Sequence, residues 1–314
     1  MNSVSGVRSE IILSANWING RVLDSTLARA ISPHGNQVHQ VSVHVGANCN
    51  IMVDAAARLL SLLNQLVLCT KRVTIEFDST DGAMGYLNRI RFFEFLSAQV
   101  VVKPLRPGLR MGAIRQGQSA NLVELMPINR GARVKRLPSQ LAERLGAACS
   151  LRTDENELTD AAFTVFSEII DNVYSHVYEN DRTDLDGYVA LQVYRNGGTA
   201  KVVVSDSGKG ILHTLRPTLS DPKLKRLSDV DLVVEIFRRG ISRHGENRGC
   251  GLKASADNAI KYKTELDVRL AECRVHLTPA RGTYQANTAY CHERLPLLWG
   301  THLCFDFSLA NQTP

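Results

Sequence analysis

A polar stripe along one expected helix carries side chains that could act on a bound ligand. Glu168, Asn172 and His176 are spaced four residues apart, so they share one face of a helix expected over residues 156–178. The rest of this stretch is strongly apolar, which indicates a helix that is buried on several sides. Polar groups on a buried helix need partners, so the stripe is a candidate ligand-binding surface. The alternative is the solvated side of an amphipathic helix.

A second candidate group follows an apolar strand expected over residues 200–205. Asp206 stands at the end of this strand, and Gly208 and Gly210 come directly after it. A carboxylate in this position can accept a hydrogen bond from an amino group, such as the exocyclic amine of adenine. The glycines leave room for a ring to lie against the backbone. The alternative is an ordinary Asp-Ser-Gly turn.

A third candidate group lies in the glycine-rich residues 245–253, directly before a helix expected over residues 252–261. Backbone amides of such a stretch, at the N-terminus of a helix, can bind phosphate groups. The residues concerned are Arg248, Gly249, Gly251 and Leu252. Their spacing matches neither the phosphate-binding loop of P-loop proteins nor the dinucleotide-binding GxGxxG turn. A flexible loop is the alternative here.

Together and in this order, the three groups resemble the GHKL family of ATP-binding proteins, which includes DNA gyrases and histidine kinases. The matching motifs are ExxxNxxxH at residues 168–176, DxGxG at residues 206–210 and a second glycine motif at residues 248–252. Gly300-Thr301 resembles the Gly-Thr pair that opens the last strand in the family. The resemblance covers about residues 153–310 and implies an α/β sandwich with a mixed sheet.

The resemblance also implies a role for each residue. Asn172 would bind a Mg²⁺ ion that bridges the phosphates of ATP, and Asp206 would recognise the adenine amine. Thr301 would support Asp206 or a nearby water, and Glu168 would orient or deprotonate the attacking water or serine hydroxyl. The remaining motif positions would contact the nucleotide: Gly208 and Gly210 at the base, Gly249, Gly251 and Arg248 at the phosphates, and His176 and Leu252 beside them. Residues 212–247 would form a mobile lid.

Several departures from the family pattern narrow the expected chemistry. Histidine kinases need a phosphoacceptor histidine before the ATP-binding domain, and no histidine lies between His44 and His176. Gyrase-type proteins have a following domain that donates a lysine, and we expect none here. Cys250 replaces the usual Thr, Arg or Ser, which binding by backbone amides tolerates. Residues 278–296 are expected to form an insertion between strands.

Hydrophobic patterns place these motifs in the second of two expected domains. A β-α-β-α-β order predicts a small α/β domain over residues 39–105, after an irregular or partly stranded segment at residues 1–38. Residues 106–152 are expected to form a connector, and residues 153–314 the ATP-binding domain. The elements predicted in the small domain are strands at residues 39–45, 72–77 and 100–102 and helices at residues 50–69 and 83–96.

The remaining expected elements lie outside the small domain. An Asn-Gly-Gly turn between two alternating runs predicts a hairpin of strands at residues 188–194 and 200–205. The others are helices at residues 139–145 and 229–238 and strands at residues 121–125, 265–270, 274–277 and 301–308.

The small domain resembles, more distantly, the STAS fold of anti-σ-factor antagonists. The resemblance rests on the strand at residues 72–77 and on Asp78, Ser79 and Thr80, which precede a helix. STAS proteins are substrates of GHKL serine kinases, so a fusion of the two would be consistent. The alternative is that Ser79 or Thr80 caps a helix.

The composition is that of an ordinary globular protein with a mild basic excess. The net charge of +6 over 314 residues fits a polyphosphate ligand or an acidic partner, and it leaves nucleic acid open without favouring it. Seven cysteines without a CxxC pair or zinc spacing indicate reduced thiols in a cytoplasmic protein. Asp54 and Arg58 interrupt the longest apolar stretch, so we expect no membrane span, and the N-terminus is not that of a signal peptide.

The sequence therefore predicts a module that binds ATP and Mg²⁺ and acts as a regulatory switch with slow ATP hydrolysis. It would work with a protein partner or as a homodimer. Two alternatives stay open: a protein serine/threonine kinase of the anti-σ-factor type, and a nucleotide sensor without turnover.

Overall fold

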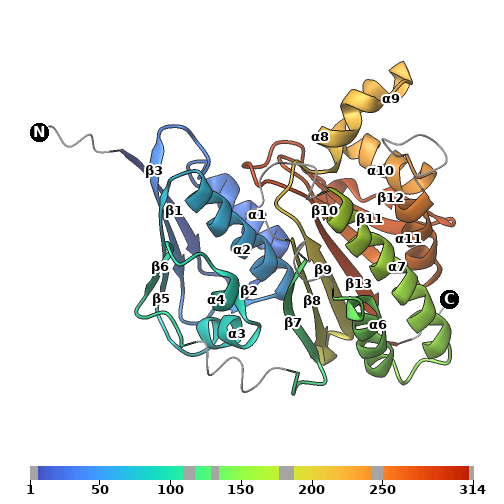
Figure 1. Ribbon diagram of the computed structural model, residues 1–314, viewed down its shortest axis with the longest axis horizontal. Coiled ribbons are helices and arrows are strands. Elements are labelled where there is room, and N and C mark those ends of the chain that lie inside the picture. Colours follow the sequence, from blue (N-terminus) through green and yellow to red (C-terminus); the bar gives the residue numbers. More distant parts are fainter. Residues whose placement is uncertain (1–5, 109–116, 129–133, 177–186, 242–249, 311–314) are drawn as a thin grey trace, which may run out of the picture. The chain divides into compact units, whose positions relative to one another are not determined.

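The computed structural model describes residues 6–108, 117–128, 134–176, 187–241 and 250–310, without the side chains of Ser175, His176 and Cys250. The chain divides into two compact units (Figure 1). The first is Met1–Ser119 with Leu295–Leu298, and the second is Ala120–Arg294 with Trp299–Pro314. Both units combine helices with sheets, parallel in the first and antiparallel in the second, so the predicted α/β fold is confirmed.

The first unit is built on a parallel sheet in the order β1-β3-β5-β6, which follows the sequence. Because each strand pairs with the next one along the chain, right-handed crossovers bring the intervening helices to one face. Figure 1 shows α1 (Gly20–Arg29) and α2 (Val53–Leu68) side by side on that face. The strands are Val7–Leu13, Val38–Val45, Arg72–Phe77 and Val101–Lys103.

A buried ion pair joins α1 to α2. Arg58 Nη1 lies 3.0 Å from Asp24 Oδ2, and both side chains are almost completely excluded from solvent. One helical turn before Arg58, the Asp54 carboxylate accepts the backbone N–H of Gly20 at 2.8 Å. These charged contacts fix the two helices in one arrangement, since neither charge can be buried without its partner.

Residues 1–38 were expected to be irregular or partly stranded. The strand β1 lies there, but so does the helix α1, which was not predicted. β1 is hard to recognise in the sequence because Arg8, Ser9 and Glu10 interrupt its apolar pattern. Pairing with β3 and burial of Ser9 nevertheless make it a strand of the sheet. The unit also contains a two-residue pair of strands, β2 (Trp17–Ile18) and β4 (Asn50–Ile51).

The helix predicted over residues 83–96 is divided in two. It consists of α3 (Ala83–Arg89) and α4 (Phe92–Phe95). Arg91 between them has a φ of 68°, in the left-handed region, which ends one helix before the next begins. Hydrophobic periodicity continues through this break, because Ile90 and Phe92 are both fully buried.

The second unit is built on a seven-stranded sheet in the order β12-β11-β10-β13-β9-β8-β7. Every neighbouring pair is antiparallel, whereas the sequence predicted a mixed sheet. Short turns join β8 to β9, β10 to β11 and β11 to β12, and strands joined by short turns must run in opposite directions. In spatial order the strands are Thr283–Ala286, Arg274–Ala280, Glu265–Arg269, His302–Ser308, Thr199–Ser205, Gly187–Tyr194 and Leu122–Ile128.

Helices pack on one face of this sheet and bury a single large core against it. Figure 1 shows α7 and α11 beside each other on that face, and shorter elements follow β9 at one end. The long helices are α6 (Leu137–Ala148), α7 (Glu155–His176), α10 (Asp229–Arg239) and α11 (Cys250–Lys261). The short ones are α8 (Ile211–Leu215), η3 (Arg216–Thr218) and α9 (Pro222–Lys225).

The boundaries of the two units differ from those predicted for the domains. The expected connector over residues 106–152 contains β7 and α6, which belong to the sheet and core of the second unit. The second unit therefore begins near residue 120 instead of 153. The expected insertion over residues 278–296 extends β11 and forms β12 and a short helix, η4 (Thr288–Tyr290), at the edge of the sheet.

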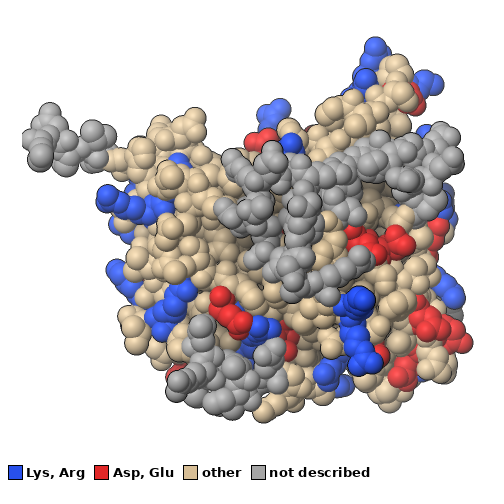
Figure 2. All heavy atoms as spheres, viewed as in Figure 1, with Lys and Arg blue, Asp and Glu red and all other residues tan. Residues whose placement is uncertain are grey.

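The charge on the surface is mixed, and most of the cysteine thiols are buried. Among the described residues on the face in Figure 2, basic and acidic side chains are interspersed and do not form one basic field. The thiols of Cys49, Cys149, Cys273 and Cys304 are buried, and Cys69 and Cys291 are partly exposed; none of these six forms a disulfide bond. No helix within the described ranges is long and apolar enough to span a membrane.

Candidate functional site

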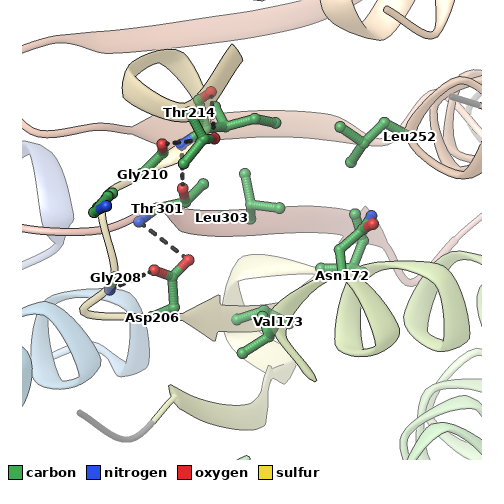
Figure 3. Close-up of a pocket in the computed structure, with 13 residues that line it drawn as sticks. Asn172, Val173, Asp206, Gly208, Gly210, Thr214, Leu252, Thr301 and Leu303 are labelled. Atoms are coloured by element: carbon green, nitrogen blue, oxygen red, sulfur yellow. Dashed lines mark hydrogen bonds between the residues drawn. The ribbon is translucent and has the colours of Figure 1, made fainter. Parts of the chain in front are cut away.

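One pocket of the second unit is lined by four segments that are far apart in the sequence. α7 contributes Ile169, Asn172 and Val173, and α11 contributes Leu252. Figure 3 shows Asn172 and Leu252 on one side of the pocket and the loop after β9 on the other. That loop and the neighbouring strands supply Val204, Asp206, Gly208, Lys209, Gly210, Ile211, Thr214, Thr301 and Leu303.

Asn172 places an unsatisfied amide against this pocket. Its neighbours Ile169, Ile170 and Val173 are buried in the core, which orients the helix and leaves Asn172 at the pocket wall. The Nδ2 atom of Asn172 is buried, and no group in the described part of the chain hydrogen bonds to it. Because buried polar groups in native proteins are nearly always hydrogen bonded, this amide is positioned for a ligand or a water.

The Asp206 carboxylate is held from both sides at the end of β9. Its Oδ1 accepts the backbone N–H of Gly208 at 2.8 Å, and its Oδ2 accepts the backbone N–H of Thr301 at 3.2 Å. The backbone N–H of Asp206 in turn donates to the Thr301 carbonyl at 2.9 Å. Each carboxylate oxygen has a second lone pair, so both can still accept a donor from a ligand.

Burial raises the pKa of Asp206 to about 6, and the hydrogen bonds from Gly208 and Thr301 oppose this shift. The carboxylate is therefore mostly ionised at neutral pH, but it takes up a proton under mildly acidic conditions. An ionised carboxylate accepts hydrogen bonds and donates none, so at neutral pH this wall of the pocket selects for a donor.

Two glycines allow the loop after β9 to meet the start of β13. Gly210 and Gly300 have φ angles of 78° and 96°, which favour glycine. A Cβ on Gly300 would collide with the backbone carbonyl of Asp206, and a Cβ on Gly210 would lie 2.9 Å from the Gly300 carbonyl. Gly208 has less need to be glycine, since its φ is not positive and its nearest neighbour would be Asp206 Oδ1 at 3.1 Å.

Thr301 connects three parts of the site. In addition to its backbone contacts with Asp206, its hydroxyl accepts the backbone N–H of Ile211 at 3.1 Å, at the start of α8. Thr214 strengthens the same turn, because its hydroxyl donates to the Ile211 carbonyl at 3.0 Å. The predicted supporting position of Thr301 therefore coincides with a junction of β9, α8 and β13.

Glu168 lies next to the pocket but does not line it. It is partly exposed on α7, and a Cβ on Gly251 would collide with its carboxylate, so Gly251 allows α11 to pack closely on α7. Within the described ranges, Glu168 makes no hydrogen bond or ion pair. Its carboxylate lies beside the N-terminus of α11, one helical turn from Asn172.

Some predicted residues lie outside the described part of the structure. These are Arg248, Gly249 and the side chain of His176. Within the described residues, no cluster of three or more His, Cys, Asp or Glu side chains is arranged to hold a metal ion. The predicted metal ligand, Asn172, is an amide and would need further ligands from a bound anion or from water.

Sequence reasoning missed several residues of the pocket. Ile169 and Val173 flank Asn172 on the same helical face, and their spacing of three and one residues from it could have identified them. Leu303 lies on β13 two residues after Thr301, a spacing that places alternate side chains of an extended chain on the same face. Thr214 and Lys209 carry no comparable signal.

Comparison of the chain with protein-family models, with curated proteins and with solved structures gives no match. What is known of the site therefore comes from its own residues.

The steric role of Gly300 predicts the effect of a single methyl group. Gly300→Ala should lower the free energy of unfolding by about 3 kcal/mol or more, because the new Cβ overlaps the Asp206 carbonyl in addition to straining the backbone. Gly282→Ala is the matched control, since Gly282 has a φ of 74° but open space around it. It should cost about 1–2 kcal/mol through backbone strain alone. Equal losses in urea denaturation would contradict the steric assignment.

Proposed function

We propose that the second unit binds ATP with Mg²⁺ in the manner of the GHKL family and acts as a nucleotide-dependent regulatory switch. The observation that carries the proposal is the convergence of separated motifs on one pocket. Asn172, Asp206, Leu252 and Thr301 come from four segments of the sequence, and all four line it. Ordinary turns and solvated helix faces would not be expected to meet in this way.

The apolar side chains of the pocket, together with Asp206, suit an adenine ring. Ile169, Val173 and Leu303 offer apolar surface for the ring, and Asp206 offers an ionised acceptor for its exocyclic amine. A guanine ring has a carbonyl at the corresponding position, which would face the carboxylate without a hydrogen bond. This complementarity favours adenine over guanine nucleotides.

The part of the pocket beside the N-terminal end of α11 suits phosphates. The N-terminal end of α11 begins at Cys250 and presents backbone amides beside Leu252, and a helix N-terminus attracts anions. Asn172 lies on the same side of the pocket as Leu252 (Figure 3), and its amide can be turned so that the oxygen faces a cation. Bound Mg²⁺ would neutralise part of the phosphate charge, and Asn172 is the residue suited to hold it.

Glu168 gives the site a group that could act on the terminal phosphate. A free carboxylate near the phosphates can orient an attacking hydroxyl and accept its proton. Water as the attacking group would give slow hydrolysis, and a serine or threonine hydroxyl would give a protein kinase of the anti-σ-factor type. A third reading, a sensor without turnover, requires only the pocket.

Binding should depend on the pocket amide. ATP with Mg²⁺ should raise the melting temperature of the wild type, and Asn172→Ala should reduce that shift strongly, because it removes the group assigned to the cation. Thr164→Ala, on the same helix but outside the pocket, is the control and should keep the full shift. GTP should stabilise the protein less than ATP. An unchanged shift in Asn172→Ala, or no shift in the wild type, would refute the proposed site.

Turnover should depend on Glu168. Glu168→Ala should slow phosphate release or transfer by about 10²–10⁴-fold and leave ATP affinity within a few-fold of wild type, as expected for loss of a general base. Radiolabelled ATP would separate the readings, since free phosphate indicates hydrolysis and labelled protein indicates a kinase. Full activity in Glu168→Ala would refute its role, and absence of both products in the wild type would leave a sensor.

The raised pKa of Asp206 predicts how base recognition depends on pH. Binding of an amine donor favours the ionised carboxylate, so a proton must leave Asp206 before binding below about pH 6. The affinity for adenosine should be constant above that pH and fall by up to about tenfold per pH unit below it. Adenosine is the suitable probe, because it has no phosphate to titrate. A constant affinity between about pH 5 and pH 8 would contradict the assignment of Asp206.

A further inference from the structure

β1 forms an edge of the parallel sheet that is unusually open. It has seven residues, contains no proline and pairs only with β3 among the described strands. The opposite edge, β6, has three residues and ends at Lys103-Pro104. Short length, lysine and proline are common ways to protect an edge from pairing, and β1 has none of them.

The edges of the seven-stranded sheet are also protected. β12 has only four residues, and β7 carries Pro127 and a register irregularity between Val123 and Met126. Each of these features interrupts the regular row of backbone groups that another strand would need. β1 has a register irregularity only at its start, between Val7 and Arg8, and Arg8 to Leu13 pair regularly with β3. Among the described sheet edges, this stretch of β1 therefore offers the longest regular row.

The backbone groups that point away from β3 can be identified from the end of β1. The Leu13 carbonyl accepts the N–H of Gly46, which follows β3. Because the direction of backbone groups alternates along a strand, Ser9, Ile11 and Leu13 face β3. The N–H and carbonyl groups of Arg8, Glu10 and Ile12 therefore face outward, and no group in the described part of the chain pairs with them.

Two residues of opposite charge, Arg8 and Glu10, stand on either side of Ser9 in β1. Arg8 and Glu10 stand on either side of it on the solvent face, with Nε of Arg8 3.2 Å from Oε1 of Glu10. Val7 and Ile11 flank them on the other face. If such a strand is paired antiparallel with a copy of itself about Ser9, every Arg8 lies opposite a Glu10.

We propose that β1 is a self-pairing edge, on which a second copy of this chain adds its own β1 antiparallel, with the two-fold axis at Ser9. In this register Arg8 of one copy and Glu10 of the other form a hydrogen-bonded pair, twice, and Val7 faces Ile11. Gly6 lies opposite Ile12, whose side chain is exposed in the single copy. The result is one continuous eight-stranded sheet with the helices of both copies on the same face.

Charge also disfavours the neighbouring registers. With the axis at Glu10, the two Glu10 side chains would lie directly opposite each other, and like charges in that position destabilise a sheet. With the axis at Arg8, the two Arg8 side chains would do the same. The outward-facing pairs thus select the register about Ser9 and also select a copy of this chain as the partner.

The test is the oligomeric state of the full chain, measured by analytical ultracentrifugation over a range of concentrations. The wild type should reach a mass twice its monomer value of 34.7 kDa. Glu10→Pro removes an outward N–H and leaves the pairing with β3 intact, because proline is tolerated on an edge strand whose N–H faces outward. It should keep the circular dichroism spectrum and melting behaviour of the folded protein and be monomeric.

Charge reversal tests the register. Arg8→Glu and Glu10→Arg should each raise the dissociation constant of the dimer by about tenfold or more, because each places like charges opposite one another. The double variant Arg8→Glu/Glu10→Arg restores opposite charges and should recover wild-type affinity. Arg72→Glu, on the same face but two strands away, is the control and should have no effect.

A wild type that stays monomeric would overturn the proposal. So would a dimer that persists unchanged in Glu10→Pro, since it would have to use another surface. A dimer that Glu10→Pro dissociates, but in which charge reversal has no effect or the double variant fails to recover, would refute the register about Ser9.

Discussion

The reciprocal pairing of Asp206 with Thr301 is the contact on which the site of the second unit depends. It joins the end of β9 to the start of β13, and these segments are 95 residues apart in the sequence. The two strands are neighbours at the centre of the sheet, so the pairing can form only when the last strand has been added between β9 and β10. The carboxylate, the turn into α8 and one wall of the pocket are thus set by the completion of the sheet.

Most of the regular elements could be predicted from local pattern alone. The strand predicted at residues 72–77 coincides with β5, and the Asn-Gly-Gly turn lies between β8 and β9 with Gly198 at a φ of 64°. Both signals are local, in alternation and in turn chemistry. β1 could not be found in this way because its polar residues depend on pairing with β3 for their place in the sheet. Strand direction in the second unit likewise depends on how the strands pair, which sequence pattern does not specify.

The sequence predicted several residues of the candidate site, but it did not predict which of them line the pocket. A four-residue spacing puts Glu168 and Asn172 on one helical face, as predicted, but it also separates them by about 6 Å along the helix axis. This distance is enough to place Asn172 at the pocket wall and Glu168 beside the first turn of α11. The steric demand at Gly300 could not be predicted, because it comes from a carbonyl that only the folded chain brings near.

The strand order of the first unit has a consequence for where chemistry can occur in this protein. In open parallel sheets, ligands settle in the crevice that opens where the strand order reverses and helices leave for opposite faces. The order β1-β3-β5-β6 contains no reversal among the described strands. Among the described strands, the architecture thus gives the first unit no such crevice, and the feature that it presents to a neighbouring strand is the edge β1.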